Sequence, residues 1–460
     1  MAVVPLWANR LHTGTTRVEE IDHVPVQAIG HRISLDELVQ PRFGLLRESA
    51  TAVTDADEPN MTAFTVSAGD MAALAKNWTP RTSPIRVRGT GAAPDRSSCR
   101  LPALAEALER YSAARYHAVE SVMASANELG QDALDLDTIP HCSAKELRHP
   151  KAPLAMPRKD VPIRWVKAIS LHDAGIVWVP LVMAFMHIHP VLPGENFWLQ
   201  ISTGCAAHTS YEEALIRAIH EVIERDAVSL LWLQRLPLPR IEFDANLPEQ
   251  ARSPERLIVG RRNVEYQFYN ATTDLGIPTV YGCQLAPNHT YARTLVSCST
   301  APTFVEAIGK VIRDMGVLRI RFQKRATFPS TLEAFNEVSH GATYMAREEM
   351  EEQFGFLVNS GKRTKLTELL RHDHSTGTLK HVLAILKKRG LAVYAVDLST
   401  DEARRCGMRV VRAIIPGLQP LSFNYLAQFR GHSRLYEAPS AMGYTTCDED
   451  GLNPWPQPFM

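Results

Sequence analysis

The chain has 460 residues, of which 45% are hydrophobic, so it can bury a large core, and its 50 basic and 50 acidic residues leave no formal net charge. This balance argues against nucleic acid as a partner. Seven scattered cysteines indicate neither a disulfide framework nor a zinc ribbon, and no stretch approaches the roughly 20 apolar residues of a membrane span, so we expect a cytoplasmic protein with no membrane segment.

The first half of the chain shows few long elements. Residues 1–33 have weak periodicity and are expected to form an N-terminal extension, whereas residues 34–460 contain no convincing linker and are expected to form one unit. A helix is predicted to begin near Pro102, because proline suits the first helical position. Residues 176–189 are predicted to form a pair of buried strands broken at Pro180.

The second half is richer in predicted helices. One helix should follow Ser210, which forms a potential capping box with Glu213, and run to about Trp232. The later predicted elements are a helix at 302–321, a helix at 378–389, and a strand, helix and strand between 392 and 415. This mixture predicts an α+β protein in which long helices flank mixed β-sheets.

Two of these helices carry the same pattern, Glu-x-x-Glu-Arg, first in ALAEALER at 103–110 and again in AIHEVIER at 218–225. At 100° per residue, the second helix places Glu213, Glu221 and Glu224 on one face and its apolar residues on the other. The repeated pattern consists of Glu106, Glu109, Arg110, Glu221, Glu224 and Arg225.

Two interpretations of this repeat are open. Solvated helix faces explain it simply, because a Glu and an Arg four residues apart form a common surface pair that contributes only about 0.2–0.5 kcal/mol. The alternative is that the two helices face each other, in which case four carboxylates would repel unless divalent cations lay among them. Mg²⁺ prefers such oxygen ligands together with a nucleotide, and arginine offers forked donors to phosphate.

The motifs around the two helices resemble a known family. GTGAAPDRSSCRLPALAEALERYS at 89–112 and STGCAAHTSYEEALIRAIHEVIERDA at 202–227 look like the two signatures of the YcaO superfamily, in the family's order and spacing. Residues 393–400 and 407–423 resemble the C-terminal half of its cyclodehydratase branch, and the NPWPQPFM ending resembles that branch's Pro-x-Pro-x-Pro tail. The resemblance therefore implies a YcaO fold over residues 34–460.

This resemblance implies an ATP-dependent enzyme that acts on a ribosomally made precursor peptide. A Cys, Ser or Thr side chain attacks the preceding carbonyl, ATP phosphorylates the resulting oxygen, and loss of phosphate leaves a thiazoline or oxazoline ring. The implied partners are the precursor peptide, an E1-like protein that binds its leader, and an FMN-dependent dehydrogenase if azolines become azoles. The implied cofactors are ATP and Mg²⁺, with Glu106, Glu109, Glu221 and Glu224 as metal ligands and Arg110, Arg225, Glu213 and Thr209 as nucleotide contacts.

The chain departs from the family pattern at a loop. The family's Gly-Lys-Gly is replaced by Gly89-Thr90-Gly91, so a cation expected near the phosphates is absent. Arg86 and Arg88 are the candidates to replace it. The helix at 302–321 should supply a further nucleotide contact, for which Lys310, Arg313, Arg319 and Arg321 are all candidates.

The tail suggests a role of its own. Pro454, Pro456 and Pro458 alternate, which favours a polyproline II arm with a rise of about 3.1 Å per residue. Such an arm is expected to carry the α-carboxylate of Met460 to the nucleotide, where it can act as general base or orient the attacking side chain. The alternative is a disordered chain end.

Two alternative functions and two pairs of histidines also need to be considered. YcaO relatives also install thioamides or amidines, although the proline tail favours ring formation, and the absent loop lysine motivates a non-catalytic nucleotide-binding scaffold. His187 and His189 lack an evident third metal ligand and are better explained as structural. His372 and His374 are expected in a solvated loop.

Overall fold

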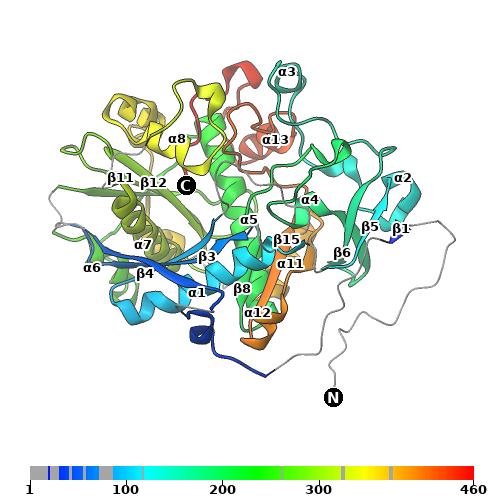
Figure 1. Ribbon diagram of the computed structural model, residues 1–460. Helices are drawn as coiled ribbons and strands as arrows, with labels where there is room; N and C mark the ends of the chain where they lie inside the picture. Colours follow the sequence, from blue (N-terminus) through cyan, green and yellow to red (C-terminus); the bar gives the residue numbers. More distant parts are fainter. Residues whose placement is uncertain are drawn as a thin grey trace.

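The computed structural model describes residues 19–20, 31–40, 44–54, 58–71, 86–116, 119–260, 263–322, 327–371 and 377–460. In this part of the chain three sheets are combined with long helices, and one helix, α5, passes through the middle of the molecule (Figure 1). The predicted α+β class, with mixed sheets flanked by long helices, is confirmed. Residues 1–18 and 21–30 lie outside the described residues, so the N-terminal extension remains a prediction.

The largest sheet has seven strands in the order β1-β5-β6-β14-β15-β8, and β7 pairs with β6. All its described pairs are antiparallel. Its strands are β1 (Glu19–Glu20), β5 (Ser121–Ala124), β6 (Ile163–Ser170), β7 (Ile176–Pro180), β8 (Cys205–His208), β14 (Tyr394–Asp397) and β15 (Arg409–Ile414).

A second sheet has five strands in the order β12-β11-β10-β9-β13 and contains one parallel pair, between β13 and β9. Its strands are β9 (Arg240–Glu242), β10 (Glu265–Asn270), β11 (Thr279–Leu285), β12 (Thr294–Thr300) and β13 (Arg363–Lys365). Helix α7 (Phe304–Phe322) packs on β11 and β12 through Val311 and Met315, both fully buried. The methyl and thioether groups of these two residues fill the space over Gly282, which has no side chain of its own.

The third sheet is formed by β2 (Arg47–Val53), β3 (Thr62–Asp70) and β4 (Arg86–Ala93), and helix α1 (Arg96–Ala113) lies against β4. This packing is unusually close. A Cβ on Gly89 would lie 2.1 Å from the carbonyl oxygen of Ala103, and a Cβ on Gly91 would lie 2.0 Å from that of Cys99. Gly-Thr-Gly is therefore part of a strand whose glycines let the helix backbone approach, and not a free loop.

Helix α5 (Tyr211–Gln234) is the central element of the fold. Its 24 residues span about 36 Å at 1.5 Å per residue. It packs on β8 and β15 of the seven-stranded sheet and on β12 of the five-stranded sheet, and α1 also packs on β8. Strand β8 thus brings the two helices that carry the repeated motif to the same part of the molecule (Figure 1).

The remaining helices are shorter. They are α2 (Ala126–Leu129), α3 (Ala144–Leu147), α4 (Leu181–Ala184), α6 (Ser253–Ile258), α8 (Val338–Met345), α9 (Gly355–Val358), α10 (Leu366–Leu370), α11 (Leu379–Lys388), α12 (Asp401–Arg405) and α13 (Arg434–Ala441). The predicted helices at 302–321 and 378–389 correspond to α7 and α11, and the predicted strand, helix and strand correspond to β14, α12 and β15.

Three local predictions were wrong. Helix α1 begins at Arg96, capped by Asp95, and Pro102 lies inside it, where the carbonyl it leaves unbonded belongs to an exposed turn open to water. After Pro180 the chain forms the short helix α4 instead of a second strand. Ser210 is the N-cap residue of α5, but its side chain makes no capping hydrogen bond.

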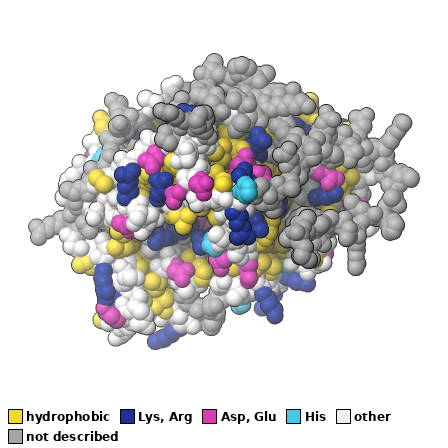
Figure 2. Space-filling view, turned by 60° about the horizontal axis from the view of Figure 1, so that its bottom comes forward, with side chains coloured by type: hydrophobic (Ala, Val, Ile, Leu, Met, Phe, Trp, Pro, Cys, Tyr) yellow, Lys and Arg dark blue, Asp and Glu magenta, His cyan; other side chains and the backbone are white. Residues whose placement is uncertain are grey.

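The surface shows no concentration of one charge on the face drawn in Figure 2, where basic and acidic side chains are interspersed. This agrees with the balanced composition. No described helix is both long and apolar enough to cross a membrane.

Candidate active site

The first glutamate of each motif is held in the same way. In α1, Glu106 accepts a hydrogen bond from the backbone N–H of Thr90 at 2.5 Å and pairs with Arg110 at 2.6 Å. In α5, Glu221 accepts a hydrogen bond from the backbone N–H of Gly204 at 3.0 Å and pairs with Arg225 at 3.2 Å. Each helix therefore uses one carboxylate to bind a glycine-containing segment and to orient the arginine one turn later.

The close approach behind Gly204 explains its residue type. Gly204 has φ +84°, and a Cβ there would lie 2.4 Å from the carbonyl oxygen of Ala413 in β15. Only glycine combines this backbone conformation with this contact. The segment before β8 is thereby held against β15 of the seven-stranded sheet, with the N–H of Gly204 directed at Glu221.

Glu109 occupies a different environment from Glu106. Burial, together with repulsion from Glu221 and Glu106, raises its pKa well above the ordinary range for a glutamate. The opposing cations are Arg110 and Arg412. Glu109 of α1 therefore lies close enough to Glu221 of α5 for their carboxylates to repel each other, as the interpretation with facing helices expects, and this repulsion destabilises the ligand-free protein.

Arg412 was not identified from the sequence. It lies on β15 and is almost completely buried, with 4% of its surface exposed. Its Nη1 donates to the carbonyl oxygen of Ile201 at 2.8 Å and contacts Cys205 Sγ at 3.2 Å, while its Nε has no hydrogen-bond partner among the residues that the structure describes. Strand β15 thus places a buried cation near Glu109, which the residue pattern of the two helices does not reveal.

Glu224, the second glutamate of α5, joins this helix to α7. It is 4% exposed and accepts hydrogen bonds from the backbone N–H of Thr300 at 3.1 Å and from Lys310 Nζ at 3.4 Å. Attraction to Glu224 raises the pKa of Lys310. Burial raises the pKa of the neighbouring Asp314 to about 6, with Lys310 opposing the shift and Glu224 adding to it. A further carboxylate from α7 therefore faces the same region.

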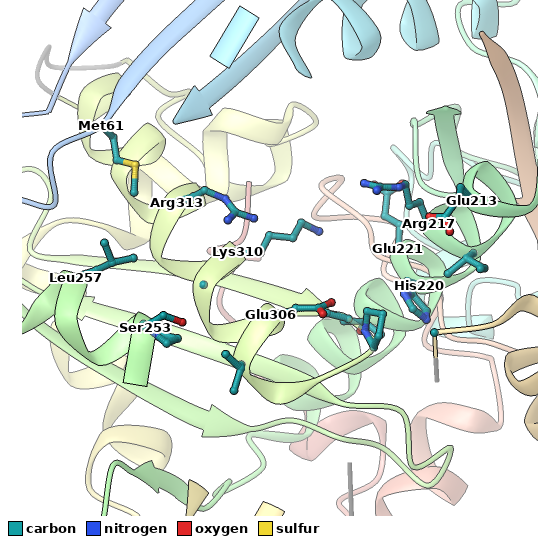
Figure 3. Close-up of a pocket in the computed structure, with 18 of the residues that line it drawn as sticks. Met61, Glu213, Arg217, His220, Glu221, Ser253, Leu257, Glu306, Lys310 and Arg313 are labelled. Carbon is teal, nitrogen blue, oxygen red and sulfur yellow. The ribbon is translucent and has the colours of Figure 1, made fainter. Parts of the chain in front are cut away.

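A cleft of ≈ 690 Å³ opens between α5 and α7 (Figure 3). Lys310 and Arg313 extend into it from α7, and Glu213, Arg217 and Glu221 approach from α5. Met61 and Leu257 lie on the side of the cleft away from Glu213 and Arg217, and this side is more apolar (Figure 3). Pro94 and Pro254 also line the cleft. The cleft therefore offers cations and carboxylates at one end and a hydrophobic surface at the other, a combination suited to a nucleotide.

The candidate cations of the sequence analysis fall into distinct places. Lys310 and Arg313 line the cleft. Arg319 is buried in the interior, where it pairs with Glu58 at 3.1 Å, so it is not available to a ligand in the cleft. Burial lowers the pKa of Arg321, with repulsion from Arg88 and Arg110 adding to the effect, which places these three guanidinium groups near one another.

Thr90 and Thr209 are less directly placed. The Thr90 hydroxyl lies 3.1 Å from that of Thr65 on the neighbouring strand, and Thr90 is not among the residues that line the cleft. Thr209 is exposed in the turn before α5 and does not line the cleft either. The side chain of Arg86 and residues His372 and His374 lie outside the described residues. The phosphate contact predicted for Thr209 remains a prediction.

His220 is a second residue of the site that no sequence motif indicated. It lines the cleft beside Glu221 (Figure 3). Only 5% of its surface is exposed, and its Nε2 is buried without a hydrogen-bond partner in the described part of the chain. Burial, with Lys310 and Arg217 nearby, lowers its pKa to about 4. It is therefore a neutral imidazole at physiological pH.

The C-terminal tail is packed, not disordered. The backbone N–H of Asn453 donates to the carbonyl oxygen of Leu233 at 2.8 Å, and Trp232 Nε1 donates to that of Trp455 at 3.0 Å. Further along, the ring of Phe459 covers the guanidinium of Arg225, with 4.5 Å between Cζ and the ring centroid. The tail therefore runs back along α5 toward the repeated motif.

The residues present suit a divalent cation chemically. Among the described residues no three His, Cys, Asp or Glu side chains form a ready-made metal site. The hydrogen bonds of Glu106 and Glu221 account for this, because each carboxylate is turned toward a backbone N–H and an arginine. Mg²⁺ usually keeps several waters and phosphate oxygens and needs few protein ligands, so converging carboxylates that repel one another still fit it.

Solved structures with the same fold include a heterocyclase in complex with substrate and cofactor, with a TM-score of 0.71 and 20% identity over 92% of this chain and 56% of that one. YcaO from Methanopyrus kandleri, bound with AMPPCP and Mg²⁺, matches with a TM-score of 0.54 and 18% identity over 81% and 86%. A chain of the E. coli microcin synthetase McbBCD complex with pro-MccB17 bound matches with a TM-score of 0.59 and 14% identity over 92% and 98%. This chain thus spans only about half the length of the heterocyclase.

The sequence itself is similar to that of an uncharacterized protein from Methanothermobacter thermautotrophicus, with 27% identity over 71% of this chain and 80% of the relative. Residues 72–419 match the model of a family described as YcaO cyclodehydratase, ATP- and Mg²⁺-binding. That range covers both helices of the repeated motif, the cleft and most of the three sheets. The chain therefore belongs to the YcaO cyclodehydratase family.

Proposed function

We propose that the protein is an ATP-dependent cyclodehydratase that converts Cys, Ser or Thr residues of a ribosomally made precursor peptide into thiazoline or oxazoline rings. One observation carries this proposal: α1 and α5 bring the two Glu-x-x-Glu-Arg motifs together at strand β8, next to a cleft lined by further cations. Membership of the YcaO family supports it.

In this proposal ATP lies in the cleft between α5 and α7. Lys310 and Arg313 bind its phosphates from α7, and Arg225 and Arg110 bind them from the two motifs. The apolar end of the cleft takes the adenine. Mg²⁺, when bound, neutralises phosphate charge, and the residues that would hold it are Glu106, Glu109, Glu221 and Glu224.

The reaction consists of addition, phosphoryl transfer and elimination. The thiol or hydroxyl of the peptide adds to the preceding carbonyl carbon and loses its proton, and the resulting oxygen attacks the γ-phosphorus of ATP, releasing ADP. The C–O bond then breaks with loss of phosphate as the amide N–H gives up its proton and a C=N bond forms. The peptide loses one water, and a poor leaving group has been replaced by a good one. The chain contributes mainly positioning and charge stabilisation.

The tail is the proposed source of the base. Its course along α5 supports this assignment, since it brings the chain end to the side of Arg225. Pro454 is exposed, whereas Pro456 and Pro458 are buried, so the alternating prolines act as a stiff arm held by packing. The α-carboxylate of Met460 has an ordinary pKa of about 3.5, which desolvation would raise toward that of a useful base.

Partners are part of the proposal. The microcin synthetase relative works as a complex, which supports an E1-like protein that binds the leader of the precursor peptide. An FMN-dependent dehydrogenase would be required only if azolines are oxidised to azoles. A cytoplasmic location is consistent with seven cysteines that are all unpaired.

The replacement of the loop lysine by Thr90 keeps a second candidate open, a nucleotide-binding scaffold without catalysis. ATP hydrolysis that depends on the precursor peptide distinguishes the two: a cyclodehydratase hydrolyses ATP only with the peptide and its partner present, and a scaffold does not. Product mass separates ring formation, which removes one water, from thioamide formation, which replaces oxygen by sulfur.

A further inference from the structure

Arg225 is held by two side chains and keeps one donor unused. Its Nη2 pairs with Glu221 at 3.2 Å, its guanidinium face is covered by the ring of Phe459 at 4.5 Å, and its Nε is buried without a partner among the described residues. The side chain of Arg225 is only 17% exposed, and Phe459 is 4% exposed. The chain thus holds a largely buried guanidinium with an unused donor next to Glu221, which lines the cleft.

Phe459 reaches this place because the preceding tail is fixed along α5. Asn453 bonds to Leu233 and Trp232, and Trp455 bonds to Trp232, at the end of α5 remote from the motif. Eight residues of helix, about 12 Å, separate Leu233 from Arg225. The backbone of Gln457 lies so close to α8 that a Cβ on Gly341 would be 2.2 Å from its carbonyl oxygen.

An aromatic ring over a guanidinium has two effects. It attracts the cation through the ring quadrupole, more strongly where water is excluded, and it fixes the plane in which the guanidinium presents its donors. An arginine with a fixed plane loses less conformational freedom when it binds a phosphate.

We propose that the C-terminal tail completes the nucleotide site, with Phe459 acting as a positioning residue that holds Arg225 ready for phosphate oxygens. Tail docking and nucleotide binding are then coupled, and the coupling is reciprocal: the tail tightens the nucleotide and the nucleotide tightens the tail by the same factor. This inference rests on the proposed function, because it takes the ligand of Arg225 to be a nucleotide. It also gives a role to the two residues that follow the last proline.

The test compares two matched substitutions. Phe459→Leu keeps an apolar side chain but removes the ring, and Phe354→Leu makes the same change at another buried position of the same hydrophobic cluster, against Trp232. Binding of AMPPCP with Mg²⁺ and of adenosine is measured by calorimetry for each folded variant. We expect Phe459→Leu to weaken AMPPCP binding by on the order of tenfold and to leave adenosine binding unchanged, because a desolvated cation–π contact contributes about that factor. Phe354→Leu should change neither.

A double substitution checks that the effect passes through Arg225. In an Arg225→Lys background, Phe459→Leu should have little further effect on AMPPCP binding. A second measurement uses the unmodified protein: AMPPCP with Mg²⁺ should slow removal of the C-terminal residues by carboxypeptidase. Equal AMPPCP affinity of the wild type and Phe459→Leu, or equal digestion rates with and without nucleotide, overturns the coupling. Failure of the wild type to bind AMPPCP at all overturns the proposed function and the inference with it.

Discussion

Two substitutions that each remove one negative charge from the motif should shift the stability of the ligand-free protein in opposite directions. Glu221→Gln is expected to destabilise it, because the Glu221 carboxylate accepts hydrogen bonds from the N–H of Gly204 and from Arg225. Glu109→Gln is expected to stabilise it, because Glu109 is partly buried and repelled by Glu221 and Glu106. Sequence alone gives no reason to separate the two.

The magnitude for Glu221→Gln follows from its partners. The amide oxygen of Gln can accept from one of them, but its NH₂ group then faces a donor, so one hydrogen bond to a charged group is lost, about 1.5–3 kcal/mol. An unfolding entropy of about 2.1 cal/mol/K per residue gives roughly 1 kcal/mol/K for a chain of 460 residues. The Tm of the ligand-free protein should therefore fall by about 1.5–3 °C.

For Glu109→Gln the size of the stabilisation depends on pH. The pKa of Glu109 is higher in the folded protein than in the unfolded chain, so the folded state binds more protons and loses stability as the pH rises from about 4.5 through the folded pKa. Gln does not ionise, so this loss disappears in the variant. The stabilisation should be present at pH 7.5 and nearly absent at pH 4.5.

The assay is thermal unfolding of the wild type, Glu221→Gln and Glu109→Gln at these two pH values, without and with AMPPCP and Mg²⁺. Ligand should raise the Tm of the wild type and have much less effect on either variant, because both remove a proposed Mg²⁺ ligand. If Glu109→Gln lowers the Tm of the ligand-free protein at pH 7.5 as much as Glu221→Gln does, the repulsion described here does not exist.

Three further predictions concern the cleft and the tail. Lys310→Met should weaken AMPPCP binding by at least about tenfold, as expected for a lost charge-assisted phosphate contact. Thr90→Lys should not tighten it, because Lys310 and Arg313 line the cleft and Thr90 does not; tighter binding by Thr90→Lys in calorimetry would contradict this. His220→Leu should raise the free energy of unfolding of the ligand-free protein by about 1–3 kcal/mol, because it removes an unpaired buried nitrogen. This gain should be larger at pH 5 than at pH 8. The pKa of His220 is lowered to about 4 in the folded state, so the wild type loses stability as the pH falls from 6.5, and the variant does not. Urea titrations that show no gain at either pH would contradict this prediction. Adding two residues after Met460 should abolish ring formation while AMPPCP still binds. Deleting residues 459–460 should weaken both ring formation and AMPPCP binding. An extended protein that forms rings at the wild-type rate would refute the proposed role of the Met460 carboxylate.

The local sequence predicted what depends on helical periodicity. The long helix from Tyr211 to Gln234 and its carboxylate face follow from residues three or four positions apart, whereas the approach of the two motifs depends on the packing of both helices on β8. The start of α1 could not be predicted in this way, because Asp95, seven residues before Pro102, is an equally good cap and a proline is tolerated where the lost hydrogen bond faces water.

The rest of the site depends on contacts between distant segments. Arg412 reaches Glu109 from a strand more than 300 residues later, and Glu224 meets Thr300 and Lys310 from another sheet and helix. Gly89 and Gly91 resemble a phosphate-binding loop in the sequence, yet they pack against a helix backbone, which only the folded structure shows. The alternating prolines predicted a stiff tail, but they did not predict that Phe459 would lie over Arg225.

The proposed cyclodehydratase forms azoline rings with consumption of ATP. The direct test is mass spectrometry of a precursor peptide encoded beside it in the genome, co-expressed with the chain and with an E1-like partner encoded nearby. We expect a peptide that has lost one water for each modified Cys, Ser or Thr, and an unmodified peptide with the Glu221→Gln variant. A peptide of unchanged mass with the wild-type chain, or one in which oxygen is replaced by sulfur, would contradict it.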